Sequence, residues 1–348
     1  MSVRVDTIPV RLQHQFKESA LDQWMQQHVE DYAGPLKVEQ FAGGQSNPTY
    51  RLSTPGRQYV MRRKPPGELL KGAHAVDREA KVLRALAGQG FPVPRVYSLC
   101  QDDSVIGTWF YVMEMVRGRI FWSATFPEVS RAERPRYFDA MNSTLAQLHA
   151  IAPEAAGLAD FGRPDRYFER QIARWSAQYS ADAEAGRDPH LDRMLEWLPD
   201  HIPPGEESSV VHGDFRCDNM IFHPARPEIL AVLDWELSTL GHPLADFAYH
   251  LMMYRLPPLG IAGLRGEDLQ QLNIPTEREY VEAYCRRTGR AALDNLNFYL
   301  AFNVFRFSAI VHGIKGRVLR GTAASPNAQT LVQALPQFAA IAWSLANE

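Results

Sequence analysis

The chain has 348 residues, of which 45% are hydrophobic and 22% are charged, and its formal net charge at pH 7 is −3. These values are typical of a globular protein with a sizeable core and about two domains. A charge so close to neutral gives no support for a nucleic-acid partner or for an anionic membrane surface. The three cysteines are isolated, which argues against a disulfide framework and a zinc site and indicates the reducing cytoplasm.

Neither a targeting segment nor a membrane span is predicted. Residues 1–19 lack an apolar core of signal-peptide length. The most apolar later segment, residues 297–314, contains Asn303, Arg306 and His312. It is too polar to span a bilayer and is predicted to be a buried helix. We therefore expect a soluble protein.

The first part of the chain alternates between strand and helix patterns. Apolar spacing predicts a helix over about residues 14–32. Residues 36–54 indicate a strand, a glycine-rich turn and a second strand, and residues 57–64 indicate a third strand. Residues 75–90 have the period of a helix that ends at glycine, and residues 107–118 indicate another strand. This part is expected to be mostly β with one long internal helix.

The remainder is predicted to be mainly helical, with short strands around one polar loop. Asp214 follows an apolar strand, Asn219 comes five residues later and precedes a second strand, and Asp234 ends a third. If the last two strands pair as a hairpin, Asn219 and Asp234 lie close together. Their oxygen atoms are the hard ligands that Mg²⁺ prefers. Asp214 is then free to accept a proton or to orient a hydroxyl.

The pattern HGDxxxxN, with an aspartate 15 residues after the asparagine, resembles the catalytic core of the aminoglycoside phosphotransferase and choline kinase superfamily. The resemblance covers the chain after about residue 35. It implies an α+β, protein-kinase-like fold with two lobes. Residues 1–117 would form a small, mostly β nucleotide-binding lobe. Residues 118–348 would form a larger, mainly helical lobe for catalysis and acceptor binding.

The same resemblance assigns roles to the residues of the motif. It implies that Asp214 is the catalytic base and that Asn219 and Asp234 hold Mg²⁺. The phosphate donor would be ATP, and the partner a small-molecule hydroxyl acceptor. We expect a monomer or a homodimer.

Three segments look closest to one branch of this superfamily, the kinase-like domains fused to some acyl-CoA dehydrogenases. They are RRKPPG, LDWELSTLGHPLADFAYH and FNVFRFSAIVHGIKGR. The chain is expected to be too short to carry a dehydrogenase domain as well, so the dehydrogenase activity is not transferred to it.

A phosphate-binding cation is expected on the third strand. Period 2 places Val60, Arg62 and Lys64 on one face. The resemblance to the kinase VAIK pattern implies that Arg62 grips the phosphates, with Lys64 as the alternative. Glu79 falls inside the apolar stripe of its helix and needs a partner there. The resemblance pairs it with Arg62.

Two backbone segments complete the expected nucleotide site. Gly43 and Gly44 permit close backbone approach to phosphates, and Ser46 and Asn47 add donors, although the loop lacks GxGxxG. The backbone from Glu114 to Val116 is expected to reach the adenine edge, as the segment between the lobes does in the family.

Other residues leave alternatives open. Asp246 could cap a helix, whereas the resemblance implies that it braces the catalytic loop. Four late basic residues would favour an acceptor with carboxylate, phosphate or coenzyme A if they face the cleft, and would otherwise form a solvated face. They are Arg306, which is the best candidate, Lys315, Arg317 and Arg320.

Two further function classes remain from the sequence. A metal-dependent hydrolase would use ligand types that are present here, but it needs more closely set clusters. Those ligand types are at His212, Asp214, Asp218, His223 and Asp234. The complete motif argues against a kinase-shaped protein that binds ligand without turnover, while Arg62 and the unusual glycine loop leave that class open. Within the phosphotransferase class, an aminoglycoside-type enzyme is the alternative.

Overall fold

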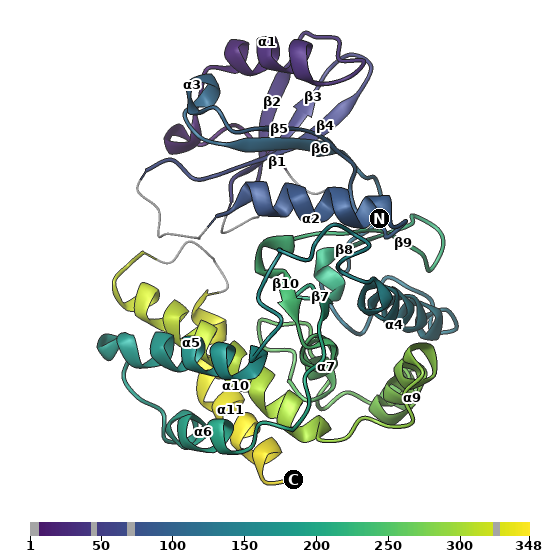
Figure 1. Cartoon of the computed structure of the whole chain (residues 1–348), viewed down its shortest axis with the longest axis vertical. Helices are drawn as coiled ribbons and strands as arrows, with labels where there is room; N and C mark the ends of the chain where they lie inside the picture. The colour runs from purple at the N-terminus through teal and green to yellow at the C-terminus, as the bar shows by residue number, and fades with distance from the viewer. Residues whose placement is uncertain (1–6, 43–46, 68–73, 323–327) are drawn as a thin grey trace. The chain divides into compact units, whose positions relative to one another are not determined.

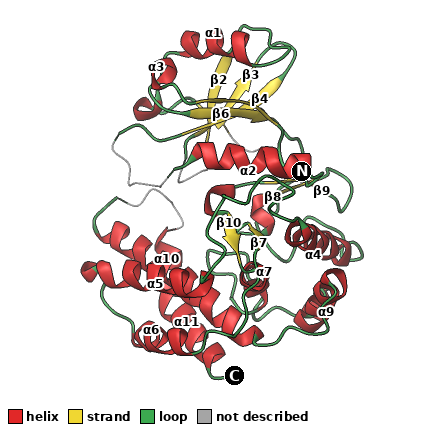
Figure 2. Ribbon diagram, viewed as in Figure 1, coloured by secondary structure: helices red, strands yellow, loops and turns green. Residues whose placement is uncertain are grey.

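The computed structural model describes residues 7–42, 47–67, 74–322 and 328–348. The chain forms two compact units. The first takes Met1–Arg119 and Ile221–Glu236, and the second takes Ile120–Met220 and Leu237–Glu348. A strand-rich first unit and a helix-rich second unit confirm the predicted α+β class (Figure 2).

The first unit contains a six-stranded sheet whose neighbouring strands are all antiparallel. The strand order is β1-β2-β3-β4-β6-β5. The strands are β1 (Thr7–Ile8), β2 (Lys37–Phe41), β3 (Thr49–Ser53), β4 (Gln58–Arg63), β5 (Val96–Cys100) and β6 (Phe110–Glu114). The predicted hairpin before Asp234 is also present, because β8 (Met220–Phe222) pairs with β9 (Ile229–Val232).

Helices cover both faces of this sheet (Figure 1). Helices α1 (Glu18–His28) and α3 (Asp103–Ile106) lie on one face, and α2 (Val76–Gly88) lies on the other. Alternation along β4 explains the two layers, because Tyr59 and Met61 enter the core with α1 while Arg62 points to α2. The predicted face of Arg62 is therefore confirmed.

Helix α1 is shorter than the sequence predicts. Residues 12–14 form a separate short helical turn, and Lys17 precedes the helix without a side-chain cap. Phe16 instead packs edge-on against Tyr50 of the sheet, with ring centroids 5.4 Å apart. Packing of this ring against the sheet accompanies the later start of the helix.

The second unit is built around a long buried helix. Helix α10 (Leu296–Leu319) packs against α5, α6, α7 and α11. The other helices are α4 (Arg134–Ala150), α5 (Tyr167–Ala181), α6 (Pro189–Asp200), α7 (Pro243–Leu251), α8 (Leu269–Leu272), α9 (Glu277–Thr288) and α11 (Ala328–Ala346). The expectation of a buried helix over residues 297–314 is confirmed. In the part of the chain that the structure describes, no helix is long and apolar enough to cross a bilayer.

A two-stranded antiparallel sheet supports the polar loop that holds Asp214. Strand β7 (Ser209–Val211) pairs with β10 (Thr239–Gly241), with Val211 opposite Thr239. The sequence did not indicate β10, which has only three residues and follows a polar turn. The loop begins directly after β7.

A buried histidine fixes the start of this loop. His250 Nδ1 donates to the carbonyl of Phe215 at 3.0 Å, so its Nε2 is unprotonated and accepts from Tyr280 Oη at 2.6 Å. Burial lowers the pKa of His250 to about 4, and hydrogen bonding to Phe215 only partly opposes this shift. The folded chain therefore requires the neutral imidazole.

This requirement predicts a pH-dependent loss of stability. An ordinary histidine pKa is about 6.5, so His250 stabilises the fold fully above that pH and less as pH falls towards 4. The contribution is on the order of 3 kcal/mol. We expect the free energy of unfolding, measured by urea denaturation, to fall more steeply from pH 6.5 to pH 4 in the wild type than in His250→Gln. Parallel pH curves for the two proteins would contradict this.

Candidate active site

The backbone of the polar loop turns sharply after β7. Gly213 has φ +84°, and a Cβ at this position would lie 2.9 Å from the carbonyl oxygen of Leu237. Only glycine combines that conformation with such close packing. His212 Nδ1 accepts the backbone N–H of Asp214 at 3.1 Å. These contacts aim Asp214 out of the strand.

Asp246 on α7 braces this turn, as the resemblance implies. Its carboxylate accepts the N–H of His212 at 2.7 Å and the N–H of Gly213 at 2.8 Å. His149 Nε2 lies 3.2 Å from the same carboxylate. Burial alone would raise the pKa of Asp246, but its hydrogen bonds to His149 and to the loop hold it below its usual range. The brace is therefore an ionised carboxylate.

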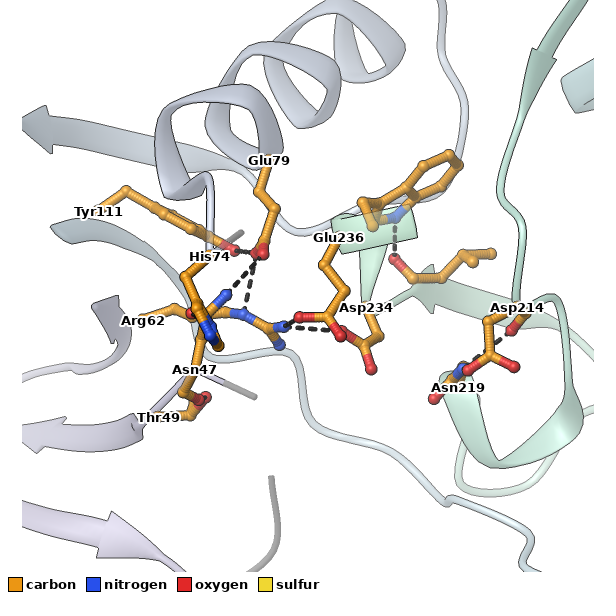
Figure 3. A network of polar contacts seen from close by, with 12 residues as sticks. Asn47, Thr49, Arg62, His74, Glu79, Tyr111, Asp214, Asn219, Asp234 and Glu236 are labelled. Carbon is orange, nitrogen blue, oxygen red and sulfur yellow. Dashed lines mark hydrogen bonds and ion pairs between the residues drawn. The ribbon is translucent and has the colours of Figure 1, made fainter. Parts of the chain in front are cut away.

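The carboxylate of Asp214 is held at both oxygens. Tyr249 Oη donates to Oδ1 at 2.6 Å, and Arg216 Nε lies 3.1 Å from the same oxygen. Asn219 Nδ2 lies 2.9 Å from Oδ2 and 2.9 Å from the backbone carbonyl of Asp214 (Figure 3). Asp214 thus has one fixed orientation and remains partly exposed.

Two arginines contact the loop and its neighbouring acids. Arg216 joins Asp214 to Asp218, with Nη2 at 3.0 Å from the Asp218 carboxylate. Arg306 on α10 is 5% exposed, and its Nη2 donates to the carbonyl of Gly213 at 2.7 Å. This differs from the expectation of an acceptor-facing Arg306, because its guanidinium is committed to the loop. Arg306 interrupts an apolar run because it lies on a buried helix, where its guanidinium reaches the loop.

In the first unit, Arg62 contacts three carboxylates. Its Nε lies 2.9 Å from Glu79 Oε2, which is the pair that the resemblance to the kinases implies. Its Nη2 lies 2.7 Å from Asp234 Oδ1 and 3.3 Å from Glu236 Oε2 (Figure 3). If all three acids are ionised, the cluster carries two more negative charges than positive ones.

Glu79 is almost fully buried on α2 and has neutral donors in addition to Arg62. Tyr111 Oη donates to Oε2 at 2.9 Å, and Asn47 Nδ2 donates to Oε1 at 2.9 Å. Burial raises the pKa of Glu79 to about 7, Asp234 and Glu236 act in the same direction, and Arg62 opposes them. The ionised form of Glu79 therefore depends on the positive charge of Arg62.

The remaining predicted nucleotide residues fall into three groups. Gly43, Gly44 and Ser46 lie outside the described residues. Asn47 is buried, and its amide is used by Glu79 and by His74, whose Nδ1 lies 3.0 Å from Asn47 Oδ1. Any effect of Asn47 on a nucleotide would therefore be indirect.

The segment after β6 has free backbone groups. The N–H of Glu114 donates to the carbonyl of Arg95 at 2.8 Å. By contrast, the backbone groups of Met115 and Val116 make no hydrogen bond to another described residue. They are available to a flat heterocycle.

Lys64 has other partners than Arg62. Its Nζ lies 4.0 Å from the ring centroid of Trp109 and 4.0 Å from Asp77 Oδ1. It makes no ion pair with Glu79, which makes Arg62 the cation of the Glu79 network.

Several residues of these networks were not singled out from the sequence. Arg216 lies two residues after Asp214, and Glu236 lies two residues after Asp234, so both were inside quoted motifs. Tyr249 lies three residues after Asp246, which places the two on one face of α7. That spacing could have identified Tyr249 from the sequence. His149 comes from α4, and no sequence pattern links it to the loop.

Metal-ligating side chains do not gather into a larger centre. Over residues 7–42, 47–67, 74–322 and 328–348, no group of three or more His, Cys, Asp or Glu side chains could hold an ion. His223 Nδ1 accepts the N–H groups of Ala225 and Arg226, each at 3.1 Å. The arrangement favours a site with few protein ligands over a binuclear hydrolase centre.

Comparisons with known proteins agree with the motif. The family model described as "Phosphotransferase enzyme family" matches residues 37–296. Acyl-CoA dehydrogenase family member 10 of Mus musculus is 43% identical, over 99% of this chain and 32% of that protein. Acyl-CoA dehydrogenase family member 11 of Gallus gallus is 42% identical, over 97% of this chain and 44% of that protein. The chain spans less than half the length of these two relatives.

Solved structures show the same fold. A Ralstonia eutropha protein provisionally named an aminoglycoside phosphotransferase is 47% identical, with a TM-score of 0.87 over 96% of this chain and 99% of that one. Choline kinase of Cryptosporidium parvum is 10% identical, with a TM-score of 0.65 over 95% and 97%. A mutant of aminoglycoside phosphotransferase APH(4)-Ia, in complex with AMP-PNP and hygromycin B, is 16% identical, with a TM-score of 0.59 over 93% and 98%. These neighbours confirm the kinase-like fold, and the family match together with the 47% identical structure shows that the chain belongs to the phosphotransferase enzyme family.

Proposed function

We propose that the protein transfers the γ-phosphate of ATP to the hydroxyl of a small molecule in a Mg²⁺-dependent reaction. The observation that carries the proposal is the carboxylate of Asp214, which is fixed at both oxygens on a braced loop. A phosphotransferase needs such a group to orient the acceptor hydroxyl. Family membership supplies the reaction class.

Each residue then has a defined task. Asp214 orients the acceptor hydroxyl and takes its proton as the new bond from oxygen to the γ-phosphorus forms. The bond from that phosphorus to the bridging oxygen breaks, and ADP leaves with the electron pair. Arg62 binds phosphate oxygens, and the backbone of Met115 and Val116 contacts the adenine edge. Residues 1–117 would be the nucleotide-binding lobe and 118–348 the catalytic and acceptor-binding lobe. The compact units differ from this division in one segment, because Ile221–Glu236, which contains Asp234, belongs to the first unit.

The residues present fit a divalent cation. Asp234 and Asn219 would hold it, and they flank the hairpin of β8 and β9. The supporting observation is that Asp234 and Glu236 share Nη2 of one arginine, which leaves negative charge that a cation would compensate. Bound Mg²⁺ would neutralise charge on the transferred phosphoryl group.

We propose that the acceptor is an acidic or coenzyme A-linked hydroxy compound. Lys315 and Arg317 on α10 make no ion pair with any acid in the described ranges, whereas Arg320 is paired with Asp182 and Glu184. Unpaired basic groups of this kind favour an anionic ligand if they face the acceptor site. The two vertebrate relatives carry acyl-CoA dehydrogenase in their names, which fits a coenzyme A ester.

We place the reaction in the cytoplasm. Cys100, Cys217 and Cys285 are buried and form no disulfide with one another. Free thiols are typical of a reducing compartment.

The first prediction from the proposed function concerns Asp214. Replacing it by asparagine keeps the side-chain shape and removes the basic oxygen, so we expect phosphate transfer to fall about 100-fold to 10,000-fold. The control is Asp139→Asn, at an exposed acid of the second unit, which should keep wild-type activity. Transfer of phosphate from radiolabelled ATP measures the effect. Equal activities of the two variants would refute the mechanism.

The second prediction concerns the nucleotide. We expect ATP to bind by calorimetry much more tightly with Mg²⁺ than without it, and Asp234→Ala to remove most of that difference. A kinase-shaped binding protein would bind ATP without transferring phosphate. No binding of ATP at millimolar concentration, with GTP also inactive, would exclude the proposed reaction.

The third prediction concerns the acceptor. We expect hydroxyacyl-coenzyme A esters or free hydroxy acids to be phosphorylated at least tenfold faster, by kcat/KM, than aminoglycosides. Polycationic aminoglycosides require an acidic pocket, which the unpaired basic residues disfavour. The opposite order would select the aminoglycoside-type alternative.

A further inference from the structure

The cation of the Glu79 network is an arginine, and arginine needs more support than lysine. An ammonium is a compact point charge that one carboxylate can hold. A guanidinium is a planar fork, so a contact at Nε alone leaves its plane free to turn about the side chain. A second contact on a terminal nitrogen fixes the plane.

The contacts of Arg62 divide its three nitrogens by task. Nε faces Glu79 at 2.9 Å, and Nη2 faces both Asp234 and Glu236. Nη1 donates no hydrogen bond to any residue that the structure describes. Nη1 is therefore the nitrogen left for phosphate oxygens.

Asp234 and Glu236 differ in whether they can keep their contact with Nη2 once a metal is bound. Asp234 makes the shorter contact, at 2.7 Å, but under the proposed function its oxygens go to the metal. A carboxylate shared with a divalent cation attracts an arginine less. Glu236, at 3.3 Å, is then the acid that remains.

The turn that presents Glu236 is anchored independently of Asp234. Trp235 is 2% exposed, its Nε1 donates to the carbonyl of Val232 at 2.9 Å, and its ring packs edge-on against Phe91. Glu236 is the next residue of this short helical turn, Trp235–Leu237. Its backbone therefore stays in place when Asp234 changes partner.

We propose that Glu236 is a positioning residue for Arg62. Together with Glu79 it holds the guanidinium by Nε and Nη2, and it keeps this hold when Asp234 binds the metal. Nη1 then stays oriented for the phosphates. This inference rests on the proposed function, and it assigns Glu236 to the arginine, with no bond to the metal.

A double-mutant cycle on ATP binding tests the assignment. The variants are Glu236→Gln, Arg62→Lys and the double variant, with Glu228→Gln as the control. Glu228 is an exposed acid next to β9 that pairs with Arg226. Dissociation constants for Mg²⁺–ATP come from calorimetry, and circular dichroism checks the fold. Mn²⁺ affinity without nucleotide is measured by electron paramagnetic resonance.

We expect Glu236→Gln to weaken Mg²⁺–ATP binding about tenfold when residue 62 is arginine and less than twofold when it is lysine. KM for ATP should rise more than kcat falls, Glu228→Gln should behave as wild type, and Mn²⁺ affinity should not fall. Glu236→Asp, which keeps the charge on a shorter arm, should lie between wild type and Glu236→Gln.

Three results would overturn the inference. Equal losses in the arginine and lysine backgrounds would remove the link to Arg62. Reduced Mn²⁺ affinity in both backgrounds would make Glu236 a metal ligand, and wild-type ATP binding in Glu236→Gln would give it no role. In each case the wild type still binds ATP, so the proposed function survives. Failure of the wild type to bind ATP would overturn both.

Discussion

The second unit depends on one buried carboxylate, that of Asp246. An ionised acid inside a protein is costly unless its oxygens are hydrogen-bonded. Asp246 meets this condition by accepting two consecutive backbone N–H groups, from His212 and Gly213, and by contacting His149. The contacts that make its burial tolerable also bend the chain after β7. Asp246 thereby sets the direction of Asp214 through the backbone, without contacting its side chain.

In the first unit, Glu79 is likewise a buried carboxylate that is surrounded by donors. This buried acid collects donors from Tyr111, Asn47 and Arg62, which come from different strands or from the loop before β3. Each donor is therefore tied to α2. In both units a buried acid belongs to a helix, and the group proposed to act on substrate belongs to a loop or strand. Rigid elements of this kind position functional side chains well.

The sequence predicted the features that depend on local spacing. Strand ends marked Asp214, Asn219 and Asp234, and period 2 and period 3.6 assigned faces to Arg62 and Glu79. The roles of these residues, and the pairing of Arg62 with Glu79, came from the resemblance to the kinase superfamily. Long-range partners were different. Strand β10 is too short to leave a pattern, and the contact of Tyr249 with Asp214 joins α7 to the loop. Arg306 was placed on the acceptor because sequence shows that it interrupts an apolar run, but not that Gly213 offers it a carbonyl.

The two units also differ in how completely their charges are balanced. Around Asp214, two arginines accompany two acids. Arg216 pairs with Asp214 and Asp218, and Arg306 lies over the ring of Tyr249, whose hydroxyl also binds Asp214. Around Arg62, three carboxylates share one cation. Carboxylates at that density repel one another, and the repulsion is relieved by added positive charge. The acids around Arg62 would therefore attract an added cation, whereas the acids of the loop already have positive partners. Under the proposed function these are the needs of phosphoryl transfer, since a divalent metal approaches an acidic cluster and the acceptor hydroxyl meets a carboxylate that is already oriented.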